Sequence, residues 1–460
     1  MSRVLFLADS PQRFKDQILF ANEISKKGVD VVFFVSETVC DRYPEIIFGL
    51  EFKIINEAQK SKEVKKNYIL SLLIDNLSDR QKSSIVALRE AIYDSFFFES
   101  KAKKREEKYF RSLKNKYTKL TKLIAENDIN VVFVNGDRHL GYEPIFLSIS
   151  KLLSIPIVIP YMVYFSEKEG LAKNGFKALG TILSSQYSKK SQERFSSHRV
   201  DNRFYYPNYI ANSLNRLGVL TDNPWFMGGG SSNIVCLPNL HMKNHYIKHA
   251  ISENKIKVVG DIAYDTLYHG TLKKQTIRLT VVLNYYLDAN KKNIIIALPQ
   301  LGEHGILSWK EHWKEIAFLM DNVNSLNQNI LISLHPKMDK NSYIFLEKKY
   351  NCRILNENLS DILVAADMFV ATFSSTVLWS TLCGIKTAVV DFYGLNYSMY
   401  DFLTSVEKID NKKNLKKSLL RVLSSQVDFT CDWEMLSKEK VFDGNTAQRY
   451  VDLIAEVVKK

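Results

Sequence analysis

The sequence predicts an α/β protein made of two doubly wound domains that face each other across a cleft. Short, almost continuously apolar runs alternate with amphipathic helical stretches along most of the chain, which is typical of parallel sheets covered by helices on both faces. The chain has 460 residues, and since a domain usually holds about 100–200 residues, two large domains are the simplest division.

The first forty residues predict one strand–helix–strand unit. RVLFLA (3–8) is a buried strand, residues 10–28 form an amphipathic helix closed by Gly28, and VDVVFFVS (29–36) is the next strand. The turn after the first strand reads ADSPQRF, so the G-x-G-x-x-G dinucleotide fingerprint is absent there. The alternation continues through a strand at 51–55, a long helical stretch to about residue 126, a strand at 130–134, a helix over 141–153 and a strand at 155–160.

The pattern loosens into polar, aromatic and glycine-rich sequence between about 184 and 230, and we expect a linker near 220–231. A second series of units is predicted to begin at NIVCL (233–237) and KVVG (257–260). The expected division is a first Rossmann-like domain at 1–222 with a basic helical insertion near 60–126, a second at 223–430, and a helical tail at 431–460 that packs back on the first. Further strands are expected at 293–298, 329–334, 352–355, 368–372 and 387–392.

Composition excludes several classes of protein. Hydrophobic residues make up 46% and charged residues 25%, which excludes wholesale disorder. No run approaches the roughly 18 apolar residues of a membrane-spanning helix, and the start of the chain lacks the apolar core of a secretion signal. The five cysteines are widely spaced and form no C-x-x-C pair, which favours a reducing cytoplasm.

The sequence gives little support for a bound metal, and we expect neither a metal nor a cofactor. His241, His245 and His249 follow one another at helical spacing, but no neighbouring cysteine or carboxylate completes a ligand set. A solvated helix face is the favoured interpretation of these histidines.

Positive charge is concentrated in one segment. The net charge is +13, and residues 101–122 hold ten Lys or Arg against two Glu. Phe110, Leu113, Tyr117 and Leu120 recur every three or four residues, so we expect an amphipathic helix with a basic outer face. That face is either simply solvated or a contact surface for an anionic membrane or acceptor. Nucleic acid is not an expected partner, because no nucleic-acid-binding module accompanies the charge.

Open parallel sheets bind ligands at the carboxyl ends of their strands, so polar residues directly after strands are the candidate site residues. His335, Pro336 and Lys337 follow the strand NILISL, where a donor imidazole and a cation suit a phosphate. The hydroxyls of Ser374, Ser375 and Thr376 begin a helix after the strand MFVAT. They either cap that helix or bind an anion together with its first backbone N–H groups.

Two more strand ends carry candidate acid or base groups. Asp137 follows NVVFV, where it either serves as a general base across the cleft or forms a local structural contact. After the strand NIIIAL, Gly302 and Gly305 permit close backbone approach to a ligand, and Gln300 and Gly302 are expected to bind the donor. Glu303 and His304 are reserve acid or base groups.

These motifs resemble the GT-B superfamily, which includes nucleotide-sugar glycosyltransferases and UDP-GlcNAc 2-epimerases. The stretch VVFVNGDRHLGYEPIFLSISKLLSIPIVIP is similar to an epimerase segment, and KIKVVGDIAYDTLY is similar to the segment that opens the second domain in that superfamily. The pairing of His335-Pro336 with Ser374-Ser375-Thr376 resembles the HP and Ser/Ser-Thr motifs of bacterial sialyl-, polysialyl- and Kdo-type transferases, whose donors are CMP-activated.

The resemblance implies a metal-independent glycosyltransferase that moves a sugar from a nucleotide-sugar donor, a CMP-ulosonic acid, to a surface glycan or glycolipid. It implies that His335, Lys337 and the three hydroxyls hold the donor phosphate, with the first domain on the acceptor side and the second on the donor side. We expect the protein in the cytoplasm, with a peripheral contact to the inner membrane face.

Two alternatives remain open. One is an epimerase-like enzyme, although PYMVYFSEKEG and TFSSTVLW stand where the epimerases have their own motifs. The other is a non-catalytic nucleotide-sugar-binding partner in polysaccharide assembly.

Overall fold

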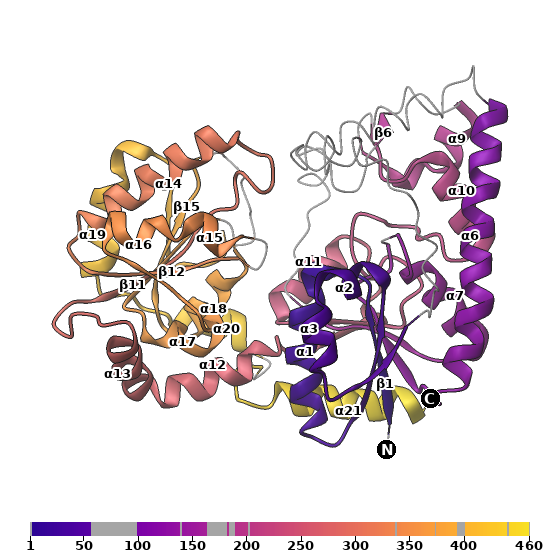
Figure 1. The fold of residues 1–460 in the computed structure, drawn as a ribbon, viewed down its shortest axis with the longest axis horizontal. Helices are drawn as coiled ribbons and strands as arrows, with labels where there is room; N and C mark the ends of the chain where they lie inside the picture. Colours follow the sequence, from indigo (N-terminus) through magenta and orange to yellow (C-terminus); the bar gives the residue numbers. More distant parts are fainter. Residues whose placement is uncertain are drawn as a thin grey trace.

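The computed structural model places the chain in two lobes, each built around one parallel sheet (Figure 1). It describes residues 2–56, 99–138, 140–162, 182–183, 189–200, 203–335, 338–372, 374–392, 401–438 and 441–459. The predicted α/β fold of two doubly wound domains is confirmed, because both sheets have the strand order of that fold.

The first sheet has seven parallel strands in the order β10-β9-β5-β4-β1-β2-β3. The chain therefore starts in the middle, winds to one edge, and returns past β1 to wind to the other. The strands are β1 (Arg3–Ala8), β2 (Asp30–Val35), β3 (Lys53–Ile55), β4 (Val131–Phe133), β5 (Ile157–Ile159), β9 (Ile234–Leu237) and β10 (Ile256–Val258).

Helices cover both faces of the first sheet, which explains why its strands are apolar on both sides. In β1, Val4 and Phe6 face a core shared with α1 and α21, whereas Leu5 and Leu7 face a core shared with α6, α7, α10 and α11. The helices of this lobe are α1 (Pro11–Ser25), α2 (Glu37–Arg42), α3 (Pro44–Phe48), α6 (Glu99–Ala125), α7 (Glu143–Leu153), α9 (Lys189–Arg194), α10 (Asn208–Leu217), α11 (Leu240–Lys248) and α21 (Thr446–Lys459), with 3₁₀ turns at Ser196–His198 and Glu253–Lys255.

The second sheet has six parallel strands in the order β13-β12-β11-β14-β15-β16. Alternate residues of β11 again face opposite layers: Ile294 and Ile296 one core, Ile295 the other. The strands are β11 (Asn293–Ala297), β12 (Asn329–Ser333), β13 (Arg353–Ile354), β14 (Met368–Ala371), β15 (Lys386–Val390) and β16 (Val406–Ile409).

Two helical layers enclose this second sheet. Helices α14, α15, α16 and α19 contribute to the core on one face, and α12, α13, α17, α18 and α20 to the core on the other. Their bounds are α12 (Ala263–Leu272), α13 (Lys274–Asn284), α14 (Trp309–Asn324), α15 (Lys340–Tyr343), α16 (Phe345–Tyr350), α17 (Leu359–Ile362), α18 (Thr376–Leu382), α19 (Leu415–Ser424) and α20 (Thr430–Ser437), with 3₁₀ turns at Leu363–Ala365 and Lys412–Asn414.

The long basic segment is a helix, and it belongs to the first lobe. Helix α6 runs along the outer side of that lobe, with Leu113, Leu120 and Ile124 buried and its basic residues largely exposed (Figure 1). A small three-stranded antiparallel sheet completes the lobe, formed by β6 (Ile182–Leu183), β8 (Arg203–Phe204) and β7 (Arg199–Val200).

The passage between the sheets lies later in the chain than the sequence predicts. Strands β9 and β10, expected to open the second domain, instead extend the first sheet beyond β5. The expected linker at 220–231 is part of the first lobe, since Trp225 and Phe226 are each only 1% exposed. The sequence pattern identifies these strands, but the choice of sheet depends on neighbours distant along the chain.

The chain leaves the first lobe through α12 and returns to it through α21, the yellow helix beneath that lobe in Figure 1. Asp265 of α12 joins these two segments, because its carboxylate accepts hydrogen bonds from the backbone N–H groups of Thr446 and Ala447 at 2.7 and 2.8 Å. Tyr450 of α21 lies in the core of the first sheet and accepts a hydrogen bond from the Tyr161 N–H.

Within the residues that the structure describes, no helix is both long enough and apolar enough to span a membrane.

Candidate functional site

The candidate site lies at the carboxyl edge of the second sheet. There the chain winds one way from β11 through β12 to β13, and the other way from β14 through β15 to β16. The loops after β11 and β14 therefore diverge at a topological switch point, where open parallel sheets bind their ligands. All six strands are parallel, so the segments that follow β11, β12 and β14 emerge at the same edge.

The loop after β11 brings four predicted residues to this edge. Gln300 is 9% exposed, and its Oε1 is buried with no hydrogen-bond partner in the described part of the chain. Glu303 is half-buried, and its Oε2 is likewise buried and unpartnered among the described residues. His304 is exposed, and its backbone N–H donates to the Gln300 carbonyl at 3.0 Å. The loop thus presents two buried acceptor oxygens at the switch point.

Two residues that were not predicted as site residues, His312 and Tyr343, form a hydrogen-bonded group next to Glu303. The Tyr343 hydroxyl donates to Glu303 Oε1 at 2.5 Å, and His312 Nε2 lies 2.9 Å from the Tyr343 oxygen. Both residues are fully buried, and burial lowers the pKa of His312 and raises that of Tyr343 well above its ordinary value. The sequence holds only a weak signal for this group, the cluster of Trp309, His312 and Trp313 at the start of α14.

His335 lies directly after β12 and is exposed. Its carbonyl accepts a hydrogen bond from the Met338 N–H at 2.8 Å, which turns the chain away from the strand. Since β11 alone separates β12 from β14, the ends of these two strands lie about two strand spacings, or about 10 Å, apart along the edge. Pro336 and Lys337 lie outside the described residues.

The three hydroxyl residues begin α18 after β14. The Ser374 and Thr376 hydroxyl oxygens are 2.6 Å apart, and Ser374 Oγ also accepts from the Thr376 N–H at 3.3 Å. Ser375 occupies the N-cap position without a side-chain capping bond. All three side chains are partly exposed, so the structure combines a capping contact by Ser374 with hydroxyls that solvent can reach.

Asp137 does not project into a cleft, contrary to the sequence-based expectation. It is 1% exposed, and its carboxylate accepts hydrogen bonds from the N–H groups of Gly228, Gly230 and Ser232 and from the Ser232 hydroxyl, at 2.7–3.4 Å. A side chain at position 230 could not fit, because a Cβ there would lie 2.6 Å from the Asp137 carbonyl oxygen. Asp137 therefore holds the glycine-rich segment on the first sheet, and this geometry does not suit a general base.

The first sheet has its own switch point, between β1 and β4, and a different carboxylate lies there. Asp9 directly follows β1, is partly exposed, and accepts a hydrogen bond from Asn135 Nδ2 at 3.2 Å. Gln17 Nε2 donates to Asn135 Oδ1 at 3.2 Å and so helps to orient the amide. Asp9 was not among the predicted site residues, although its place directly after the first strand was a usable signal.

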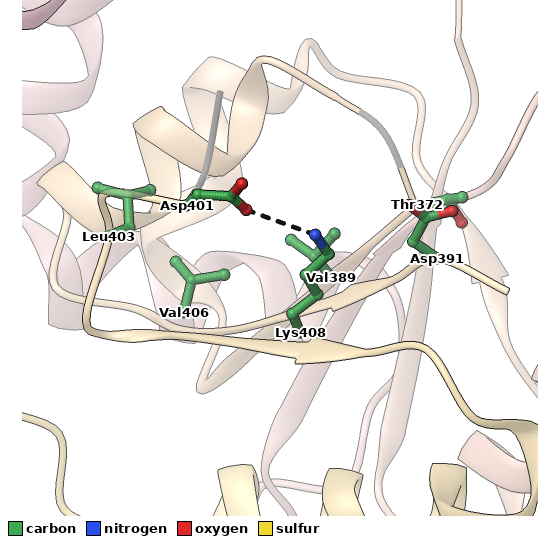
Figure 2. Close-up of a pocket in the computed structure, with 7 residues that line it drawn as sticks. All are labelled: Thr372, Val389, Asp391, Asp401, Leu403, Val406 and Lys408. Carbon is green, nitrogen blue, oxygen red and sulfur yellow. Dashed lines mark hydrogen bonds and ion pairs between the residues drawn. The ribbon is translucent and has the colours of Figure 1, made fainter. Parts of the chain in front are cut away.

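A pocket of about 300 Å³ lies on the second sheet, at the residues that follow β14 and β15 (Figure 2). Thr372 and Asp391 lie on one side of it, after β14 and β15, and Lys408 reaches across to Asp401 at 3.4 Å. Val389, Leu403 and Val406 supply apolar surface. The pocket therefore combines apolar walls with charged groups of both signs, and Thr372 on its wall precedes the Ser374–Thr376 residues by two positions.

A further carboxylate connects α18 with the segment that follows β10. Asp261 is 3% exposed and accepts hydrogen bonds from Trp379 Nε1 at 2.9 Å and from the Ala263 N–H at 3.0 Å. Burial raises the pKa of Asp261 to about 6, while the hydrogen bonds from Ala263 and Trp379 lower it by a smaller amount. This contact ties the helix that begins with Ser374–Thr376 to the end of the first sheet.

No three His, Cys, Asp or Glu side chains come together as a metal site in the described ranges. The three histidines at helical spacing lie against aromatic rings rather than around a common point. His241 stacks on Phe402 with ring centroids 3.7 Å apart, and His249 stacks on Phe226 at 4.3 Å. His245 lies 4.4 Å from the His249 ring.

No protein-family model matches the chain, and no curated protein matches it significantly. Solved structures do match along its whole length. UGT89C1 of Arabidopsis thaliana complexed with UDP is 10% identical, with a TM-score of 0.56 and full coverage of both chains. UDP-GlcNAc 2-epimerase of Methanocaldococcus jannaschii is 12% identical, with a TM-score of 0.51 over 99% of this chain and 100% of the epimerase. The spinosyn forosaminyltransferase SpnP is 10% identical, with a TM-score of 0.51 over both full chains.

At this level of identity the likeness concerns the fold. The strand orders of both sheets and the match over both lobes agree with the GT-B architecture that these structures have in common. The chain therefore has the two-domain GT-B fold.

Proposed function

We propose that the protein is a glycosyltransferase that uses a nucleotide-sugar donor, with a CMP-activated ulosonic acid as the donor class and a surface glycan or glycolipid as acceptor. The observation that supports the proposal is that Glu303, His335 and the Ser374–Thr376 residues all follow strands that end at one sheet edge, on both sides of its switch point. The CMP class rests on the resemblance of the H-P and S-S-T sequences to transferases with such donors.

The donor phosphate would lie between His335 and the hydroxyls at the start of α18. An imidazole and several hydroxyls can all donate hydrogen bonds to phosphate oxygens, and the beginning of a helix adds backbone N–H groups. Such preorganised donors stabilise the negative charge that collects on the nucleotide phosphate when its bond to the sugar breaks.

Because the Asp137 carboxylate is buried and hydrogen-bonded to residues 228–232, Glu303 is the proposed base. Its Oε2 takes the proton of the acceptor hydroxyl while that hydroxyl oxygen bonds to the anomeric carbon. The bond between the anomeric carbon and the phosphate oxygen breaks at the same time, and its electron pair stays on the phosphate. Asp9 is the competing candidate, because it is the partly exposed carboxylate at the switch point of the other sheet.

A thermal-shift panel of CMP, UDP, CDP and GDP tests the donor class, since a ligand that binds only the folded protein raises its melting temperature. We expect the largest shift with CMP. A shift with UDP alone would overturn the CMP assignment, and conversion of UDP-GlcNAc to UDP-ManNAc would establish the epimerase alternative. Tight nucleotide binding without transfer to any acceptor would favour a binding partner instead.

His335→Ala tests the phosphate contact. A charge-assisted hydrogen bond contributes about 1.5–3 kcal/mol, so CMP affinity measured by calorimetry should fall by roughly 10- to 100-fold. The matched control is His269→Ala, which removes an exposed histidine on α12. Equal affinity of the wild type and His335→Ala would contradict the phosphate assignment.

We also propose that the exposed basic face of α6 contacts an anionic membrane or glycan. Lys103, Lys104, Lys108 and Arg111 are gathered around one open hollow along this helix. Pelleting with anionic vesicles should decrease steeply as salt is added, because salt screens attraction between exposed charges. Absence of pelleting at low salt would contradict the membrane contact and leave the glycan as the proposed partner.

A further inference from the structure

The two oxygens of the Glu303 carboxyl group have different surroundings. Oε1 accepts the Tyr343 hydroxyl at 2.5 Å, whereas Oε2 is buried and finds no partner in the described part of the chain. A buried acceptor without a hydrogen bond costs about 1–3 kcal/mol, so such an atom requires an explanation. A ligand that supplies the missing hydrogen bond is one explanation, and the arrangement around Oε1 points to it.

The hydrogen bonds behind Glu303 can run in only one direction. The Gly302 N–H points at His312 Nδ1 from 3.2 Å, and a backbone N–H can only donate, so Nδ1 must be the acceptor. The proton of the neutral imidazole is then on Nε2, which donates to the Tyr343 oxygen at 2.9 Å. The Tyr343 proton is left for Glu303 Oε1. The chain of donors thus runs from Gly302 through His312 and Tyr343 to Glu303.

The surroundings of His312 hold the imidazole in this state. The ring is fully buried between Trp309, Trp313 and Tyr343, with centroid distances of 5.0–6.1 Å. Burial lowers the pKa of His312, and the nearby Glu303 charge opposes this with a smaller effect. Gly302 leaves room for this packing, because a Cβ there would lie 3.0 Å from the Trp309 ring and 3.2 Å from His312 Cγ, which is tighter than an ordinary contact.

We propose that His312 and Tyr343 are positioning residues that fix the Glu303 carboxyl group through Oε1, so that Oε2 is the oxygen that exchanges a proton with the substrate. This inference rests on the proposed function, in which Glu303 is the base. The further claim is that the hydrogen bonds from Gly302 through His312 and Tyr343 set the orientation of the Glu303 carboxyl group before the substrate binds, as preorganised sites require.

Turnover of CMP-N-acetylneuraminic acid, measured as CMP release, tests the role. We expect Tyr343→Phe to lower kcat by about 10- to 100-fold with little change in KM, because a misplaced base slows the chemical step rather than donor binding. Glu303→Gln should lower kcat by about 100- to 10,000-fold. In the Glu303→Gln background, Tyr343→Phe should cause no further loss, since both changes act on the same group.

Tyr350→Phe is the matched control. Tyr350 is also buried and lies on the neighbouring helix α16. It donates to the Ala317 carbonyl at 3.5 Å and takes no part in the hydrogen bonds that lead to Glu303. Tyr350→Phe should retain the wild-type kcat. A Tyr343→Phe enzyme as fast as wild type, or a full additional loss in the Glu303→Gln background, would overturn the positioning role.

A second measurement tests the chain of hydrogen bonds without any donor. Nitrogen-15 NMR of the histidine side chains should show His312 neutral with its proton on Nε2 at neutral pH. A proton on Nδ1 would overturn the inference whatever the activity. If His312 shows the expected tautomer but the wild type releases no nucleotide from any donor, the proposed function fails, and the role inferred for Oε2 fails with it.

Discussion

Two carboxylates that follow central strands, Asp137 in the first lobe and Glu303 in the second, have opposite surroundings. The Asp137 carboxylate accepts four hydrogen bonds, three from backbone N–H groups and one from the Ser232 hydroxyl. The Glu303 carboxyl group accepts one from Tyr343 and keeps a buried oxygen without a described partner. Both residues follow a buried strand, so position along the chain does not distinguish them.

The difference shows what separates a structural carboxylate from a chemical one. A carboxylate can accept about four hydrogen bonds. When groups of the protein already donate all four, none remains for a substrate. Asp137 fills that number with donors from the segment at 228–232 and thereby orders it. Glu303 is held from one side only, which leaves Oε2 for a ligand.

The largest expected effect is on the stability of the first lobe. Asp137→Ala leaves three buried or partly buried N–H groups without an acceptor, so the free energy of unfolding should fall by about 3–4 kcal/mol. Urea unfolding of the purified variant measures this loss. A loss below about 1 kcal/mol would remove the structural assignment of Asp137.

The matched variant in the second lobe is Glu303→Ala. This substitution removes the hydrogen bond from Tyr343, which costs stability, but it also removes the buried Oε2 that has no partner, which offsets the cost. The expected loss of stability is therefore about 1 kcal/mol or less. Equal losses for Asp137→Ala and Glu303→Ala would show that the two carboxylates do not differ in the way proposed here.

Asp261 is intermediate between Asp137 and Glu303, because its buried carboxyl group has two hydrogen-bond donors. Its pKa is raised to about 6. A raised folded-state pKa means that the fold favours the protonated form. The contribution of protonated Asp261 to the free energy of unfolding is therefore complete below the ordinary pKa of 3.8, and it is lost as the pH rises through about 6.

The expected result is a pH-dependent difference between the wild type and Asp261→Asn. The stability advantage of the wild type should shrink by about 2 kcal/mol between about pH 4.5 and about pH 7, because the asparagine does not titrate. Urea unfolding at several pH values measures it. A difference that stays constant, or that grows as the pH rises, would contradict the raised pKa.

Much of the fold could be predicted from the sequence. The runs RVLFLA and NIIIAL predicted strands because residues buried on both faces must be apolar in succession, and both form central strands. Likewise, the spacing of Leu113 and Leu120 predicted the amphipathic helix α6. These features are local, so their signal lies within a few consecutive residues.

The candidate site was predictable only in part. Strand ends identified Glu303, His335 and the hydroxyl residues, because parallel strands share a carboxyl edge. His312 and Tyr343 were missed because they lie on separate helices, 9 and 40 residues further along the chain than Glu303, and only the fold brings Tyr343 to Glu303 and His312 to Tyr343. The sequence left open whether Asp137 is a general base or a structural contact, and it did not predict the partners of Asp137, because they lie about 90 residues away in a segment taken for a linker.

The sequence by itself determined the strands, the helices and the alternating pattern that makes this a doubly wound α/β protein. Those properties follow from apolar periodicity, which neighbouring residues set on their own. Only the tertiary structure decided that β9 and β10 join the first sheet. It also decided that the Asp137 carboxylate is fully hydrogen-bonded, whereas Glu303 Oε2 has no described partner. Sheet membership and hydrogen-bond satisfaction depend on groups brought together from distant parts of the chain, and no short stretch of sequence records them.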